Sequence, residues 1–484
     1  MPHNSRLPRD VCSALLVLLV LCCVVAGRAR ADVRGAGSNA KSKAASLLRE
    51  PVAFRVYQRD RNGRADIAVA LDPGARGATL VSARLSGLPG DASIPLAGGK
   101  FAGVPTGGPY RLSVTVKVGN AERTDSVEPI FVGDLWVLAG QSNMQGIGDL
   151  IDVTPPHPKV MALEKTGHWV QAKEPLHWWL IDPKQRKGAG LGLPFAVTIV
   201  EKTKVPVGLL PCAVGGTYMT QWDPAKKGDG RRSLYGAMLD QVNKAGGKVK
   251  GLLWYQGEAE TNEQNSRVYP QVFPAFIAAV RKDFNQPDLP FYLVQIGRVI
   301  GGGVGGRNPK GWNAVREVQW HIPDQVPNTA VVSVIDLELD DFIHVGTQGL
   351  KRAGRRLALI ALGKLYGQGK VTTPNLDKVM KGPGRTLLVK FKGVNVAGDG
   401  KRGLRPARHI AGFSIRREDG LEIPSFYDAA VGPTPDTVTL KLTGDLPKGA
   451  QLWYGYGFDP YCNLTDGLDM AVPAFGPVAL DEIR

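Results

Sequence analysis

The sequence predicts an α/β fold, in which a parallel sheet covered by helices is flanked by small β domains on its N-terminal and C-terminal sides. Between residues 130 and 366, short apolar stretches alternate with segments whose apolar residues recur every three or four positions. Strands that are apolar throughout are buried on both faces, which is typical of parallel sheets. Before residue 128 and after residue 387, short alternating runs separated by Gly, Pro, Asp and Asn predict β-structure with tight turns.

This pattern divides the chain into four segments. We expect a signal peptide at 1–31, a leader with an N-terminal β domain at 32–129, the α/β domain at 130–370 and a C-terminal β domain at 371–484. The length agrees with this division, because 484 residues at about 150 residues per domain correspond to about three domains.

The segment 1–31 has the pattern of a secretion signal. A basic start precedes the apolar run 14–26, which at 13 residues is shorter than the ~20 that span a bilayer, and a small residue, Ala31, ends a cleavage site. A lipid anchor at Cys22 is the alternative, but the bulky Leu21 stands where such an anchor needs a small residue. We therefore expect a secreted or periplasmic protein that is cut after Ala31.

Composition and charge exclude several classes of protein. Hydrophobic residues make up 43% of the chain and charged residues 21%, which excludes a mostly disordered chain. The 60 Lys and Arg against 44 Asp and Glu give a net charge of +16, and loss of the signal, with four Arg and one Asp, leaves +13. These charges are scattered, which argues against a nucleic-acid site, and on a secreted protein such a basic surface makes an anionic polysaccharide the more natural partner.

The mature chain contains only Cys212 and Cys462, so it is not a disulfide scaffold. The sequence leaves open whether these two cysteines pair or remain separate buried thiols. Beyond the signal no apolar run reaches 18 residues, so we expect no integral membrane span.

The predicted sheet contains five strands, at 135–139, 205–210, 251–255, 291–295 and 330–335, and helices are expected at 234–245, 273–284 and 349–365. Reactive groups in such folds lie in the loops that follow the carboxyl ends of strands. These loops bring Ser142 after the first strand, the Gly215-Gly216 pair after the second, Gln256 after the third and His344 after the fifth.

These residue types together can carry out nucleophilic catalysis. Ser142 is a weak nucleophile unless a base takes its proton, and His344 can do so when an acid fixes its tautomer. Asp341 is placed to do this from the same loop, and Asp340 is the alternative acid. Each group alone has a simpler explanation: Ser142 as a helix N-cap, the glycines as a turn, and His344 as a surface residue. A metal site is disfavoured, because no second His or Cys cluster lies nearby at ligand spacing.

An oxyanion also needs donors that are already in place. The backbone amides of Ser142 and Gly216 and the side chain of Gln256 are the candidates. A glycine suits this position because the backbone must approach the substrate closely.

Four ordered motifs resemble those of one family, the serine esterases of the SGNH hydrolase superfamily, in the branch of the sialate O-acetylesterases and plant-type carbohydrate acetylesterases. The motifs are Gly-Gln-Ser-Asn-Met at 140–144, Val-Gly-Gly-Thr at 214–217 with Trp222, Trp-Tyr-Gln-Gly-Glu at 254–258 and Asp-Phe-Ile-His at 341–344. The likeness continues in 315–319, 454–457 and 462–464 and covers roughly residues 131–484.

The resemblance implies a flavodoxin-like three-layer α/β/α sandwich that needs no metal or other cofactor and acts on an acetylated saccharide. It implies Ser142 as nucleophile, His344 as general base and Asp341 as the orienting acid, with Ser142, Gly216 and Gln256 forming the oxyanion hole. Trp222, Glu258 and Arg316 are interpreted as substrate-binding residues, and a structural ion pair is the alternative for the last two. The sequence does not identify the acetylated sugar or the oligomeric state.

Two other functions have weaker support. The glycine-rich segment 301–306 has the spacing of a dinucleotide fingerprint, but no helix follows it at once, and a loop bordering the active site is the better interpretation. A non-catalytic carbohydrate-binding protein is compatible with the nine Trp. Aromatic residues alone, however, do not require Ser, Gly, Gln and His at four strand ends.

Overall fold

A central sheet runs through the middle of the described chain. The computed structural model describes residues 47–302, 306–396, 403–481 and 483; the expected signal peptide, nearly all of the leader and part of the glycine-rich segment, 303–305, lie outside these residues. The sheet order is β12-β11-β14-β9-β15-β16-β17. These strands are Trp169–Gln171, Val160–Leu163, Val207–Pro211, Ala121–Gly140, Gly251–Tyr255, Phe291–Gln295 and Thr329–Ser333.

All five expected strands are present in this sheet, and they pair in parallel. In chain order they are β9, β14, β15, β16 and β17, which stand in the sheet as 2-1-3-4-5, the flavodoxin-like order. The antiparallel pair of β11 and β12, which the sequence did not predict, extends the edge beyond β14. The connections after β9 and β15 leave in opposite directions, so a crevice is expected between the ends of these two strands.

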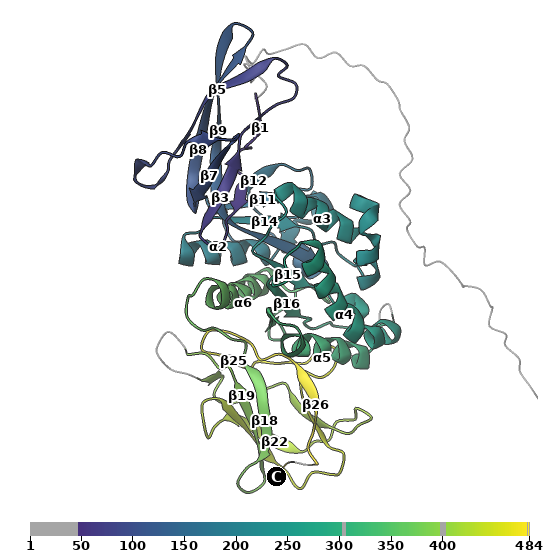
Figure 1. Cartoon of the computed structure of the whole chain (residues 1–484). Coiled ribbons are helices and arrows are strands. Elements are labelled where there is room, and N and C mark those ends of the chain that lie inside the picture. The colour runs from purple at the N-terminus through teal and green to yellow at the C-terminus, as the bar shows by residue number, and fades with distance from the viewer. Residues whose placement is uncertain (1–46, 303–305, 397–402, 482, 484) are drawn as a thin grey trace, which may run out of the picture. The chain divides into compact units, whose positions relative to one another are not determined.

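Helices cover both faces of the sheet, which makes three layers. Figure 1 shows α2 and α6 on one side and α3, α4 and α5 on the other. These helices are Gly192–Thr203, Thr347–Leu365, Leu234–Ala245, Glu263–Asp283 and Pro309–Gln325. The expected α3 matches, and α6 begins two residues earlier than expected. The sequence missed α2 and α5 and placed the start of α4 ten residues late, because Pro270 lies inside that helix.

The first half of β9 belongs to the N-terminal β region. It pairs antiparallel with β8, Gly107–Val118, which pairs with β5, Ala78–Ser86; β2, Val56–Gln58, also lies beside β9. The remaining strands here are β1 Leu48–Glu50, β3 Arg64–Ala68, β4 Ala70–Leu71, β6 Leu96–Ala97 and β7 Lys100–Pro105. The expected boundary at 129/130 therefore falls inside one continuous strand.

The C-terminal region is built from strands around its own apolar core. One sheet has the order β18-β19-β23-β22, formed by Asn375–Lys381, Thr386–Lys392, Thr437–Leu442 and Phe426–Val431. Another has the order β21-β24-β26, formed by Phe413–Arg416, Gln451–Tyr454 and Phe475–Ala479. This region also contains a short pair of strands, β20 Leu404–Arg405 with β25 Thr465–Asp466. A similar short pair, β10 Gly148–Asp149 with β13 Lys187–Ala189, lies earlier in the chain.

The two cysteines in the described part of the chain are separate. Cys212 follows β14, Cys462 lies in the C-terminal region, and both are free thiols. Among the described residues, no helix has the length and apolar character needed to cross a membrane.

Candidate active site

Ser142, His344 and Asp341 form a chain of hydrogen bonds at the carboxyl ends of the strands. Nε2 of His344 lies 2.9 Å from the Ser142 hydroxyl oxygen, and Nδ1 lies 2.7 Å from Oδ2 of Asp341. With the proton on Nδ1, the imidazole donates to the carboxylate, and Nε2 can accept the proton of the hydroxyl. Ser142 begins the short helix α1, Ser142–Gln145, directly after β9.

Asp341, rather than Asp340, contacts the histidine. Its Oδ1 accepts the backbone amides of Ile343 and His344 at 2.9 and 2.8 Å, so the carboxylate is fixed from both sides. Burial raises the pKa of Asp341, but the hydrogen bonds from His344 and the two amides outweigh burial and hold the pKa below its ordinary value. Asp340 accepts the amide of Asp149 at 2.9 Å instead.

Asn143 joins the serine segment to the histidine loop, a role that sequence reasoning missed. Its side-chain oxygen accepts the amide of Val345 at 3.0 Å, and its amide group donates to the carbonyl of Ile343 at 3.4 Å and to Glu258 at 2.7 Å. Both neighbours of His344 are thus tied to the residue beside Ser142. The only signal in the sequence was its place in the Gly-Gln-Ser-Asn-Met motif.

Two backbone amides are the candidates for binding an oxyanion. Ser142 is the first residue of α1, so its amide has no acceptor within the helix. The amide of Gly215 donates to Gln145 at 2.7 Å, and a Cβ placed on Gly215 would lie 3.4 Å from Cβ of Ser142, so this loop passes directly beside the serine. Gly216 is exposed, has a φ of +69° that favours glycine, and its amide meets no acceptor among the described residues.

Gln256, the third expected donor, is fully buried and already bonded. Its amide nitrogen donates to Oε1 of Glu260 at 3.0 Å and to the carbonyl of Thr217 at 3.3 Å. These two acceptors use both of its hydrogens. To donate to an oxyanion, Gln256 has to release one of them, and the longer bond to Thr217, next to Gly216, is the weaker of the two.

The structure corrects the interpretation of Trp222 and Arg316 as substrate-binding residues. Trp222 is fully buried, where its indole N–H donates to the hydroxyl of Thr217 and its ring packs edge-on against Trp254. Arg316 is also buried and donates to the carbonyl groups of residues 296, 297, 455 and 457. Burial lowers the pKa of Arg316 to about 9. Both residues therefore support the framework and do not reach the substrate surface.

The structure also corrects the interpretation of Glu258 as a substrate-binding residue. It is buried, and its Oε1 accepts the amide of Asn143, while its Oε2 has no partner among the described residues. Burial raises the pKa of Glu258 above its ordinary value. The alternative of an ion pair with Arg316 is also wrong, because the described hydrogen bonds of that guanidinium go to backbone carbonyls.

Two exposed aromatic residues lie close in sequence to the site residues, and sequence reasoning singled out neither. Tyr218, which is 40% exposed, follows Gly216 by two residues, and Phe342, which is 50% exposed, precedes His344 by two residues. Exposed aromatic rings next to a reactive group offer a surface for a sugar ring. Their signal in the sequence was only their nearness to the motifs.

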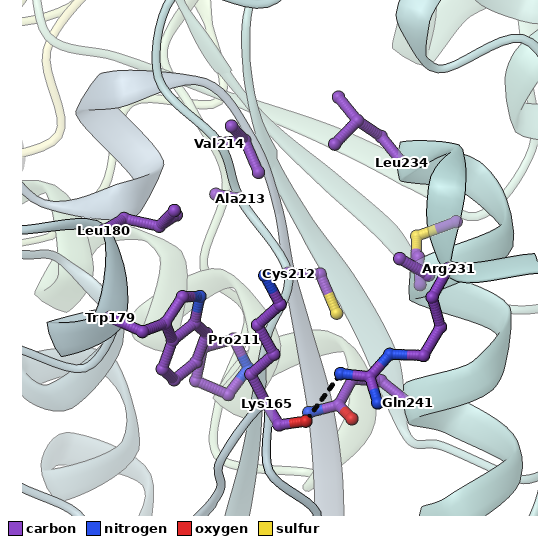
Figure 2. A pocket seen from close by; sticks show the side chains of 12 residues that line it. Lys165, Trp179, Leu180, Pro211, Cys212, Ala213, Val214, Arg231, Leu234 and Gln241 are labelled. Atoms are coloured by element: carbon purple, nitrogen blue, oxygen red, sulfur yellow. Dashed lines mark hydrogen bonds between the residues drawn. The ribbon is translucent and has the colours of Figure 1, made fainter. Parts of the chain in front are cut away.

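A small apolar cavity of about 110 Å³ lies beside the segment that leads to Gly215. Figure 2 shows Cys212, Ala213 and Val214 along one wall, with Trp179 and Arg231 nearby. Burial raises the pKa of Cys212 to about 12, so the group is a neutral thiol and a poor nucleophile. Ser142, His344 and Asp341 are not among the residues that line this cavity.

Comparisons with known proteins agree with this geometry. Residues 132–362 match the family model described as "Carbohydrate esterase, sialic acid-specific acetylesterase". Over these residues the chain is similar to that carbohydrate esterase family. The match contains all the residues expected to carry out the chemistry, from Ser142 to His344.

Proteins with similar sequences occur in plants and animals. A protein of Arabidopsis thaliana named as a probable carbohydrate esterase is 29% identical over 260 residues, which are 49% of this chain and 93% of that protein. The human sialate O-acetylesterase is 23% identical over 321 residues, which are 55% of this chain and 60% of the human protein.

A similarity of fold extends over most of the chain. The crystal structure of a carbohydrate acetylesterase from Xanthomonas citri superimposes with a TM-score of 0.62 at 23% identity, covering 89% of this chain and 99% of that chain. The expected three-layer α/β/α sandwich with additional β-structure before and after it in the chain is thereby confirmed.

Proposed function

We propose that this protein is a serine esterase that removes O-acetyl groups from carbohydrates through an acetyl-serine intermediate. The observation that carries the proposal is the chain Ser142–His344–Asp341, with atom separations of 2.9 and 2.7 Å, within residues similar to that carbohydrate esterase family. The family supports an acetylated saccharide as the substrate, and sialate is one candidate among such sugars.

In the first step the Ser142 oxygen attacks the carbonyl carbon of the acetyl ester. His344 takes the hydroxyl proton at Nε2, and Asp341 holds the imidazole in place and stabilises its positive charge. The carbonyl oxygen becomes an oxyanion, which the amides of Ser142 and Gly216 are placed to receive. As the tetrahedral intermediate collapses, the C–O bond to the sugar breaks, and the sugar oxygen takes the proton from His344.

In the second step water removes the acetyl group. His344 takes a proton from the water, whose oxygen attacks the acetyl carbon, and the same amides stabilise the second oxyanion. The bond to the Ser142 oxygen then breaks, this oxygen recovers its proton from His344, and acetate leaves. General-base assistance of this kind contributes about 10²–10⁴-fold to the rate.

We also propose that the protein is exported, because the apolar run at 14–26 and the small residue Ala31 have the pattern of a cleaved signal. An acetylated polysaccharide outside the cytoplasm is a natural substrate for such a protein. Tyr218 and Phe342 are the exposed aromatic residues best placed to contact its sugar rings.

Replacement of the nucleophile tests the proposal directly. Ser142→Ala should abolish release of p-nitrophenol from its acetate ester and labelling by a fluorophosphonate probe, while the unfolding temperature stays unchanged. Undiminished turnover in this variant, or no labelling of the parent protein, would contradict the proposal, and the second result would favour a non-catalytic carbohydrate-binding protein. Acetate release from a panel of acetylated glycans then identifies the sugar.

A further inference from the structure

A second hollow lies between helix α5 and the sheet β21-β24-β26, and the chemistry proposed above does not use it. Its volume of about 380 Å³ is within the range of about 300–1,000 Å³ typical of ligand pockets. Helix α5 presents one face to it, with residues 310, 313, 314 and 317 at helical spacing, and the C-terminal region forms the opposite wall. The residues Ser142, His344 and Asp341 are not among those that line it.

Two aromatic rings stand on the C-terminal wall. Trp453 lies in β24 between the buried Leu452 and Tyr454, so the alternation of the strand places its indole on the outer face of the sheet. The ring centroids of Trp453 and Tyr456 are 5.0 Å apart with their planes at 82°. The two rings therefore form a joined aromatic surface along the hollow.

Two glycines pack closely against these rings and hold them in place. A Cβ on Gly476 in the neighbouring strand would lie 2.7 Å from the Trp453 indole, and a Cβ on Gly420 would lie 2.6 Å from the Tyr456 hydroxyl. The guanidinium of Arg416 lies over the Tyr456 ring at 3.7 Å from its centroid. The aromatic surface is thus fixed before any ligand arrives, which reduces the entropy that binding costs.

Polar side chains with unused hydrogen-bonding capacity surround the rings. Lys310 and Gln451 line the hollow, and their side chains have no hydrogen-bond partner among the described residues. The lining carries the carboxylates of Glu317 and Glu418 and the cations of Lys310 and Arg417, and Arg417 is already paired with Asp419 at 2.7 Å. A strongly anionic ligand such as a nucleotide would meet both carboxylates, so a neutral ligand fits this lining better.

We propose that this hollow is a second carbohydrate-binding site that takes a neutral stretch of the polysaccharide chain. A sugar ring offers C–H groups on its face for Trp453 and Tyr456 and hydroxyl groups at its edge for Gln451 and Lys310. This inference rests on the proposed function for the class of ligand only. Binding at two points on one polymer would raise the local concentration of acetyl groups near Ser142.

Calorimetric titration of the full chain carrying Ser142→Ala tests the site without turnover. The probes are unacetylated xylohexaose and cellohexaose, which are neutral, with an oligogalacturonate as the anionic comparison. In this background Trp453→Ala should weaken binding of the neutral hexamers by about tenfold or more, as expected for the loss of an aromatic anchor. The matched control is Tyr427→Ala, which removes a 71% exposed tyrosine of the same C-terminal region outside the hollow and should leave the dissociation constant unchanged.

A second variant keeps the test valid if Trp453→Ala unfolds. Gln451→Ala removes a polar group of the rim without touching the rings and should weaken binding about two- to tenfold. With Ser142 restored, Trp453→Ala should hydrolyse p-nitrophenyl acetate as the parent does and should lose activity only on dilute acetylated polymer.

Three results would overturn the inference: no binding of either neutral hexamer, equal binding of the neutral hexamers with and without Trp453→Ala, or a greater loss of oligogalacturonate binding than of hexamer binding in Trp453→Ala. The proposed esterase function is tested separately by p-nitrophenyl acetate, so a failure of one proposal is distinguishable from a failure of the other.

Discussion

Asp341→Asn tests the orientation of the base most sharply, because the structure fixes how the new side chain must lie. Oδ1 of Asp341 accepts two backbone amides, at 2.9 and 2.8 Å, and only the carbonyl oxygen of an asparagine can replace it. The amide NH₂ is then forced to face Nδ1 of His344. That nitrogen must accept instead of donate, which places the imidazole proton on Nε2, where the proton of Ser142 has to go.

The expected loss in kcat is about 10⁴-fold, the size seen when an orienting aspartate of a serine hydrolase is replaced in this way. This loss corresponds to about 5.5 kcal/mol of activation free energy. The assay is p-nitrophenyl acetate hydrolysis under saturating substrate, with thermal unfolding to show that the variant folds. Asp340→Asn is the matched control: it keeps an acceptor for the amide of Asp149 and should stay within about threefold of the parent. Activity of Asp341→Asn within tenfold of the parent, or an equal loss in Asp340→Asn, would refute the reasoning.

Three further changes test residues that the sequence singled out. Gln256→Ala should lower kcat by about 10²–10³-fold if its amide turns from Thr217 to the oxyanion, and a change confined to KM would show a binding role instead. Glu258→Gln should flatten the pH dependence of stability. Burial raises the pKa of the Glu258 carboxyl, so the folded protein binds more protons than the unfolded protein. The free energy of unfolding therefore falls by about 1.4 kcal/mol for each unit of pH increase between the unfolded pKa and the higher folded pKa. Urea denaturation between pH 5 and 8 measures this slope, and an unchanged slope would contradict the assignment. Trp222→Ala should cost about 3–5 kcal/mol of unfolding free energy, because the ring is fully buried; unchanged stability with a higher KM would restore the interpretation that it binds substrate.

Much of the fold could be predicted because strands and motifs are local signals. The strands at 251–255 and 291–295 have the predicted bounds, since each is a short apolar run between polar turns. Helix α4 was placed too late because a proline inside a helix is locally unfavourable, and only packing against the sheet offsets that cost. The strands β11 and β12 are short, and their pairing depends on β14, which lies far along the chain.

The candidate site also contains some residues that local signals reveal and others that they do not. Ser142 and His344 could be found from residue type and position at strand ends, where reactive loops gather. Arg316 could not be interpreted correctly, because the carbonyl groups of residues 455 and 457 that it binds lie 139 and 141 positions away. Asn143 was missed for the same reason: its partners Ile343 and Val345 are about 200 residues distant, and nothing local indicates that they meet.

The continuity of β9 limits how this protein can be shortened or grafted onto another. One strand, Ala121–Gly140, belongs to the N-terminal β region in its first half and ends two residues before Ser142. Within it the buried Asp134 is held by Arg59 at 3.0 and 2.8 Å and by Gln58 at 3.1 Å. A fragment that starts at residue 130 would cut this strand and leave a buried carboxylate without its cation. The smallest unit to express or transplant therefore begins before the N-terminal β region and includes it.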